Sequence, residues 1–118
     1  MLPVKQLLEL TKLDGVSIVK IVGKKIPDET ISQNIGTQLL ALVGDDNHTK
    51  IIIDFSNLEY ISSTMLAQLV TMAQKARTAK VKLRLCGMQP AIHEVFGMAR
   101  LGKLLDIKGT REEALADF

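Results

Sequence analysis

One uninterrupted apolar run, "KIIIDF" at residues 50–55, constrains the fold more than any other feature of the sequence. A strand with one face in water alternates apolar and polar residues, whereas an unbroken apolar run of strand length is typical of a strand buried on both faces of a parallel sheet. Parallel neighbours cannot be joined by tight turns, so the connections between them should be crossover helices. The run therefore predicts an α/β domain in which helices cover the sheet.

Before this run, the chain predicts a hairpin and a helix. Asp14-Gly15 is a dipeptide that favours a tight two-residue turn, and the strand expected after it, Val16–Val22, is apolar on both faces. Apolar residues then recur at helical spacing to about Val43, and Asp28 is placed to cap the start of that helix. The first strand of the hairpin should run antiparallel to the second.

After the run, helices and strands alternate. The expected elements are a helix from about Thr64 with an apolar stripe, a half-exposed strand at 81–86, a helix from Pro90, a strand at 103–107 and a helix capped by Thr110. The order is therefore ββαβαβαβα, which predicts a mixed, mostly parallel sheet with helices packed against it, in a single domain over residues 1–118. In such sheets, functional residues gather in loops at the carboxyl ends of the parallel strands.

Composition and charge exclude several classes of function. The net charge of +2 is small, and the basic residues are neither clustered nor interleaved with the few aromatic residues, so nucleic-acid binding is not expected. No apolar run reaches the roughly 18–20 residues that a membrane span needs, and no signal peptide is recognisable, so we expect a cytoplasmic protein without membrane insertion. The single cysteine, Cys86, fits a reducing compartment and is expected to be buried as a small apolar residue.

No catalytic, cofactor-binding or metal-binding residue can be assigned. His48 and His93 lack the spacing to Cys, Asp or Glu that a metal site needs, and both are expected to be solvated at the surface. The segment "ISSTM" lacks the glycines of a nucleophile elbow, and the chain has neither a Walker-type phosphate loop nor a GxGxxG motif. These absences leave an enzyme without recognisable catalytic groups but do not exclude one, and we expect no cofactor.

Three consecutive hydroxyl residues, Ser62-Ser63-Thr64, stand between the buried strand and the helix that follows. A serine at a helix N-cap accepts a hydrogen bond from a free backbone N–H and is worth about 1 kcal/mol relative to alanine, a role that Ser62 or Ser63 would fill. A phosphate at the same place would lie at the positive end of the helix dipole. It would add about −1.5 to −2 charges, enough to repel a docked partner. The pattern is compatible with both capping and phosphorylation.

The run "IIIDFSNLEYISSTMLAQL" resembles the signature of STAS domains, the sulfate-transporter and anti-sigma-factor-antagonist family. Gly23, "VKLRLCGM" and "LGKLLDIKGTREEAL" support the likeness, which covers nearly the whole chain. By this resemblance, Ser63 falls on the serine that switching members phosphorylate, and Ser62 and Thr64 are the alternatives. Asp54 matches the aspartate at the end of the buried strand.

The resemblance implies an anti-sigma-factor antagonist, a non-catalytic regulator of transcription. Its partner would be an anti-sigma factor with Ser/Thr kinase activity, of the histidine-kinase-like ATPase type. Phosphorylation of Ser63 would release that complex, and a phosphatase would reverse the modification. A homodimer or an assembly of STAS proteins is a further option. The expected partner-binding residues lie in the loops around Ser63: Asp28, Tyr60, Ser62, Ser63, Met65, Met88 and Gln89. For Tyr60 and Met65, burial in the core is the alternative.

Two departures from the family pattern keep other functions open. Ser62 stands where the family usually has aspartate, and Met65 stands where it usually has glycine, beside the expected phosphorylation site. Such changes fit a kinase with different preferences, a non-switching STAS scaffold in a stress-sensing complex, or a transporter-associated STAS subunit. A small-ligand-binding module or a hydrolase that uses the same loops is an alternative of another class.

Overall fold

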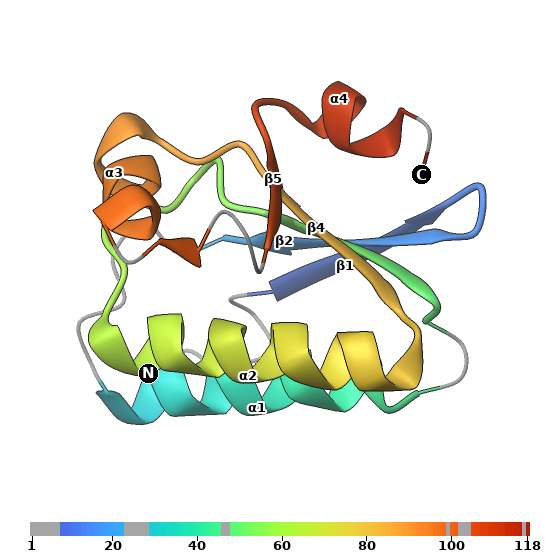
Figure 1. The fold of residues 1–118 in the computed structure, drawn as a ribbon, viewed down its shortest axis with the longest axis horizontal. Coiled ribbons are helices and arrows are strands. Elements are labelled where there is room, and N and C mark those ends of the chain that lie inside the picture. Colours follow the sequence, from blue (N-terminus) through green and yellow to red (C-terminus); the bar gives the residue numbers. More distant parts are fainter. Residues whose placement is uncertain (1–7, 23–28, 46–47, 99, 102–104, 117) are drawn as a thin grey trace.

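The computed structural model describes residues 8–22, 29–45, 48–98, 100–101, 105–116 and 118, and it confirms the expected order ββαβαβαβα (Figure 1). The elements are β1 (Leu8–Leu13), β2 (Val16–Ile21), α1 (Glu29–Val43), β3 (Lys50–Asp54), α2 (Ser63–Ala79), β4 (Lys82–Cys86), α3 (Pro90–Met98), β5 (Asp106–Lys108) and α4 (Arg111–Leu115). The last strand was expected at 103–107 and lies at 106–108. Asp28, the expected cap of α1, lies outside the described residues.

The strands form one mixed sheet in the order β1-β2-β3-β4-β5. β1 is antiparallel to β2, and the other neighbouring strands are parallel, as predicted. The hairpin turn places Asp14 at φ 51° and Gly15 at φ 81°, which are left-handed conformations that glycine adopts freely and aspartate tolerates. The turn therefore sets the register in which Leu13 pairs with Val16.

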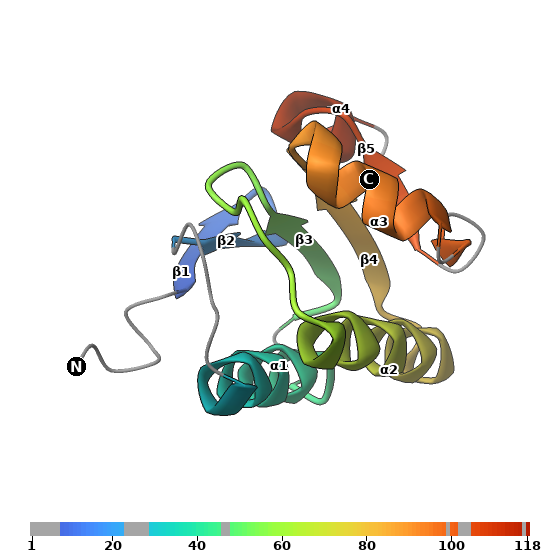
Figure 2. The same cartoon turned by 90° about the vertical axis from the view of Figure 1, so that its left-hand side faces the viewer.

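Helices cover both faces of the sheet, and two apolar cores result. α1 and α2 lie side by side on one face, and α4 lies over the other (Figures 1 and 2). Ile51 and Ile53 belong to the main core, which Phe96 of α3 extends. Ile52 belongs instead to a smaller cluster that contains Ala114 of α4. Because all three isoleucines are completely buried, the prediction of a strand buried on both faces is confirmed.

The prediction for one of the two histidines was wrong. His48 precedes β3 and is buried, and its Nδ1 lies 2.6 Å from Oγ of Ser17, a completely buried side chain of β2. A buried hydroxyl needs a hydrogen-bond partner, and the segment that leads into β3 supplies one. His93 lies exposed on α3, and Cys86 is buried, both as expected.

Candidate functional site

The candidate site lies at the carboxyl ends of the parallel strands, where residues 55–62 (the β3–α2 loop) connect β3 to α2. Phe55 and Leu58 of the loop are completely buried, whereas Ser56, Glu59 and Tyr60 are exposed. The Phe55 ring packs edge to face against Phe96 of α3, with ring centroids 6.1 Å apart. These apolar anchors fix the path of the loop, so its polar side chains are presented from a supported backbone.

Ser62 is the N-cap of α2. Its backbone is extended, with φ −82° and ψ 159°, and its Oγ accepts a hydrogen bond from the backbone N–H of Met65 at 3.1 Å. The Ser62 carbonyl accepts the first intrahelical bond, from the Leu66 N–H at 3.0 Å. This is the geometry that satisfies a free donor at a helix start. Of the two residues that the sequence offered for the cap, the structure therefore selects Ser62.

Ser63 is the first residue of α2, and its side chain is exposed. Within the described part of the chain, no hydrogen bond to the Ser63 hydroxyl is found. The first turn of α2 contains no acidic residue, so the positive end of the helix is not neutralised by its own side chains. An anionic group on Ser63 would therefore meet a favourable local potential.

Asp54, at the end of β3, is buried and organises the start of the loop. Its Oδ1 accepts the backbone N–H of Ser56 at 2.8 Å, and its Oδ2 accepts the Arg111 guanidinium of α4 through Nη2 at 2.6 Å and Nε at 3.2 Å. Burial by itself would raise the pKa of Asp54, but the Ser56 N–H and the Arg111 guanidinium outweigh burial and lower the pKa below its ordinary value. The carboxylate is thus held ionised.

Further contacts hold the loop to strands on both sides. The Asn57 amide donates to the Val22 carbonyl beyond β2 at 3.2 Å. The Phe55 N–H donates to the Cys86 carbonyl of β4 at 2.9 Å. Gly87 follows β4 at φ +72°, and a Cβ there would lie 2.9 Å from Oδ1 of Asp54, so a glycine makes room for the carboxylate.

The sequence did not reveal three of these supporting residues: Asn57, Gly87 and Arg111. A buried aspartate at the end of an apolar strand signals that a cation must lie nearby, because an isolated buried carboxylate is strongly disfavoured. That signal does not say which basic residue it is. The partner, Arg111, lies 57 positions further along the chain.

The expected partner-binding residues divide into surface and core. Tyr60 is 52% exposed and, with Ala91 and Val95 of α3, lines a shallow pocket of about 120 Å³. Met65 is only 1% exposed and lies in the main core, which is the alternative that the sequence left open for it. Its position in the first turn of α2 points the long apolar side chain inward, where burial is favourable.

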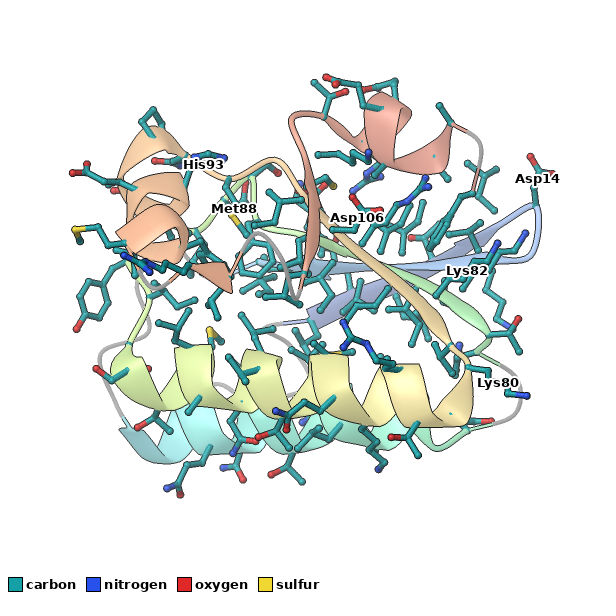
Figure 3. All side chains as sticks on the ribbon, viewed as in Figure 1. Asp14, Lys80, Lys82, Met88, His93 and Asp106 are labelled. Atoms are coloured by element: carbon teal, nitrogen blue, oxygen red, sulfur yellow. The ribbon has the colours of Figure 1, made fainter. Side chains whose placement is uncertain are left out.

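Of the two residues expected after β4, Gln89 contacts the loop and Met88 packs against the main core. Met88 is half-buried against the main core and lies between α3 and the sheet (Figure 3). Gln89 is also half-buried, and its side-chain amide donates to the Ser56 carbonyl at 3.3 Å. Asp28 lies outside the described residues.

Neither a reactive thiol nor a metal site is found among the described residues of this region. Burial, followed by the charge of Asp54, raises the pKa of the Cys86 thiol to about 12, so this side chain stays a thiol at neutral pH. Among the described residues, no cluster of three or more His, Cys, Asp or Glu side chains is arranged to hold a metal ion. Within the same residues, no helix is both long and apolar enough to cross a bilayer.

Comparison with known proteins gives one family. The family model described as "STAS domain" matches residues 7–114. A relative from Bordetella bronchiseptica, named "Putative anti-sigma factor antagonist BtrV", is 28% identical over 111 residues, which cover 94% of this chain and 93% of the relative.

Solved structures agree in fold. An anti-sigma factor antagonist from Mycobacterium paratuberculosis superposes with a TM-score of 0.78 at 22% identity, covering 92% of this chain and 89% of the other. The Bacillus cell fate determinant SpoIIAA in its phosphorylated form gives a TM-score of 0.69 at 18% identity, covering 92% and 96%. At these identities the likeness establishes the arrangement of strands and helices only.

Proposed function

Because the chain belongs to the STAS domain family, we propose that it is an anti-sigma-factor antagonist, a protein that regulates transcription by binding an anti-sigma factor. The named relative, which is matched along almost its whole length, supports this role. In this proposal the protein acts in the cytoplasm and is not itself an enzyme. Its partner is an anti-sigma factor that binds ATP and phosphorylates Ser63, and a phosphatase removes the phosphate.

The observation that supports a phosphorylation switch is that two adjacent serines have different roles. Ser62 uses its hydroxyl to cap α2, whereas the Ser63 hydroxyl is exposed at the first helical position. A phosphate on Ser63 therefore leaves the cap intact and lies where the helix dipole favours negative charge. The modification changes the charge of the surface by about −1.5 to −2 without a structural rearrangement.

The transfer step needs no catalytic group from this chain. Ser63 Oγ attacks the γ-phosphorus of ATP held by the partner, the bond from that phosphorus to the bridging oxygen breaks, and ADP leaves. The hydroxyl proton passes to a base of the partner or to water. Afterwards the phosphoserine repels acidic groups of the docked partner, and the complex separates.

The test is intact-mass measurement and peptide mapping of protein purified from its native cells, in growth and under stress. We expect a phosphate on Ser63 whose occupancy changes with condition. A pull-down with the unphosphorylated protein should recover an ATP-binding partner, and Ser63→Glu should lose it. If residues 62–64 carry no phosphate in either condition, the switch is rejected.

A non-switching scaffold is the second candidate, and two residues favour it. Ser62 stands in place of the family's usual aspartate, and Met65 fills the core where the family usually has glycine. A scaffold predicts large assemblies in solution that are indifferent to Ser63→Ala. Size-exclusion chromatography with light scattering on the two proteins separates it from the antagonist, which forms a discrete complex.

A further inference from the structure

The short C-terminal helix α4 is attached to the β3–α2 loop through a single carboxylate. The two oxygens of Asp54 serve different segments, since Oδ1 holds the Ser56 N–H of the loop and Oδ2 holds Arg111 at the start of α4. Only 8% of the Asp54 side chain is exposed, against 37% for Arg111. A carboxylate bound on both oxygens cannot rotate for one partner without disturbing the other.

A second arginine, Arg84, holds the opposite end of α4 through contacts to α4, Asp106 and Phe118. Nη1 of Arg84, on β4, donates to the carbonyls of Ala114 at 2.9 Å and Ala116 at 2.8 Å. Its Nε donates to Asp106 at 3.0 Å, and its guanidinium stacks over the ring of Phe118 at 4.6 Å from the centroid. Among the described residues, Arg111 and Arg84 therefore each attach α4 to the sheet, and the Arg111 attachment reaches the candidate site.

We propose that Arg111 is a positioning residue for the β3–α2 loop: through Asp54, it fixes the loop conformation in which Ser63 is presented to the partner. The proposal deepens the proposed function and, as far as recognition is concerned, rests on it. It makes α4, which lies far from Ser63 in the sequence, part of the recognition apparatus. A macromolecule or modification that displaced α4 would loosen the loop.

Two variants of equal charge change separate positioning from general stability. Arg111→Met removes the contact to Asp54, whereas Arg84→Met removes the other attachment of α4 and leaves Asp54 and Ser56 untouched. Hydrogen exchange followed by NMR reports on the loop through the amides of Ser56, Leu58 and Met65, and on α4 through the amides of Ala114 and Ala116.

We expect Arg111→Met to speed exchange of the loop amides about three- to tenfold, a modest range because Arg111 is partly exposed. Arg84→Met should speed exchange in α4 but not in the loop. Arg111→Lys, which keeps a cation near Oδ2, should restore part of the protection. Equal loop exchange in the two methionine variants, or no change in Arg111→Met, would overturn the positioning role.

Phosphorylation kinetics with the recovered partner then test recognition. Arg111→Met should raise the KM for this protein about threefold or more at unchanged kcat, because a mobile loop weakens docking and not the transfer step. An unchanged KM would overturn the link to recognition. If no kinase acts on the wild-type protein, the proposed function fails, and the exchange comparison still decides whether Arg111 positions the loop.

Discussion

The two ends of the sheet each contain a polar pair with at least one buried member, but the pairs are built differently. At the carboxyl end, the charged pair Asp54–Arg111 joins β3 to α4 and holds the Ser56 N–H of a loop that reaches the surface. At the amino end, the uncharged Ser17 hydroxyl meets His48 at 2.6 Å, and both side chains are buried. Figure 3 shows these ends through their labelled residues, Met88 and His93 at one and Asp14, Lys80 and Lys82 at the other.

The two pairs differ in what they support. One stabilises the fold alone, and the other also positions the loop that precedes Ser63. The Ser17–His48 pair ties the start of β3 to β2, and Nε2 of His48 also lies 3.7 Å from Oδ2 of Asp45, so loss of the pair should change stability alone. The Asp54 carboxylate also constrains the loop that leads to Ser63, so its loss should change both stability and recognition. Variants at each end of the sheet test this difference.

The largest effect on stability is expected for Gly87→Ala, a change at the carboxyl end of the sheet. Alanine is strained at φ +72°, and its Cβ would lie 2.9 Å from the Asp54 carboxylate and 3.3 Å from the Ser56 nitrogen. Together these should lower the free energy of unfolding by about 2–3 kcal/mol in urea denaturation. Gly15→Ala is the matched control, because Gly15 also has a positive φ but open space around it. Equal losses in the two variants would show that the crowding of Asp54 has no consequence.

Asp54→Asn should have the next largest effect, and its size should depend on pH. The amide can still accept the Ser56 N–H but loses the charge that attracts Arg111, so we expect a loss of about 2 kcal/mol at pH 7. The folded-state pKa of Asp54 lies below its ordinary value of 3.8, so the folded state binds fewer protons than the unfolded state in this range. The stabilisation is therefore complete above 3.8 and is lost as the pH falls through the folded-state pKa.

Denaturation of wild-type and Asp54→Asn proteins between pH 7 and pH 2 checks this dependence. The two stability curves should be separate at neutral pH and converge under acid conditions. Parallel curves would mean that the charge of Asp54 contributes nothing to folding.

Ser17→Ala tests the amino end of the sheet and should lower the free energy of unfolding by about 1–1.5 kcal/mol. The reason is that it leaves the buried His48 ring without its closest polar partner. Adding His48→Leu should cost less than the sum of the two single changes, since both polar groups are then removed together. Hydrogen exchange in the β3–α2 loop should stay at the wild-type rate in all these variants. Faster exchange there would mean that the two ends of the sheet are coupled. The Ser17–His48 pair would then affect the loop as well as stability.

Sequence patterns predicted the fold more fully than the site, for a physical reason. The "KIIIDF" run and the Asp14-Gly15 turn are local signals, and each specifies a strand environment or a turn without reference to distant residues. The pairs Asp54–Arg111 and Ser17–His48 join residues 57 and 31 positions apart. Such contacts depend on how elements pack, which explains why Arg111 was missed and His48 was misplaced at the surface.

Met65 shows the same limit at close range. It stands two positions after Ser63 in the sequence, yet it is buried while Ser63 is exposed. Neighbours near the start of a helix can point to opposite sides, and only the packing of α2 against the sheet decides which one faces the core.

The smallest effects on stability are expected at the adjacent serines Ser62 and Ser63. They compare a capping hydroxyl with an exposed one at the carboxyl end of the sheet. Ser62→Ala removes the acceptor of the Met65 N–H and should cost about 1 kcal/mol. Ser63→Ala removes an exposed hydroxyl and should change the free energy of unfolding by less than about 0.5 kcal/mol. Ser62→Asp should retain full stability, because aspartate is an equally good cap and its charge suits the helix start.

Phosphorylation by the recovered partner should show the reverse order. Ser63→Ala should abolish the modification, while Ser62→Asp should retain it, since the hydroxyl that accepts the phosphate is untouched. If Ser63→Ala destabilised the protein more than Ser62→Ala, the hydroxyl of Ser63 would be part of the fold. The separation of capping from switching, on which the proposed function depends, would then be lost.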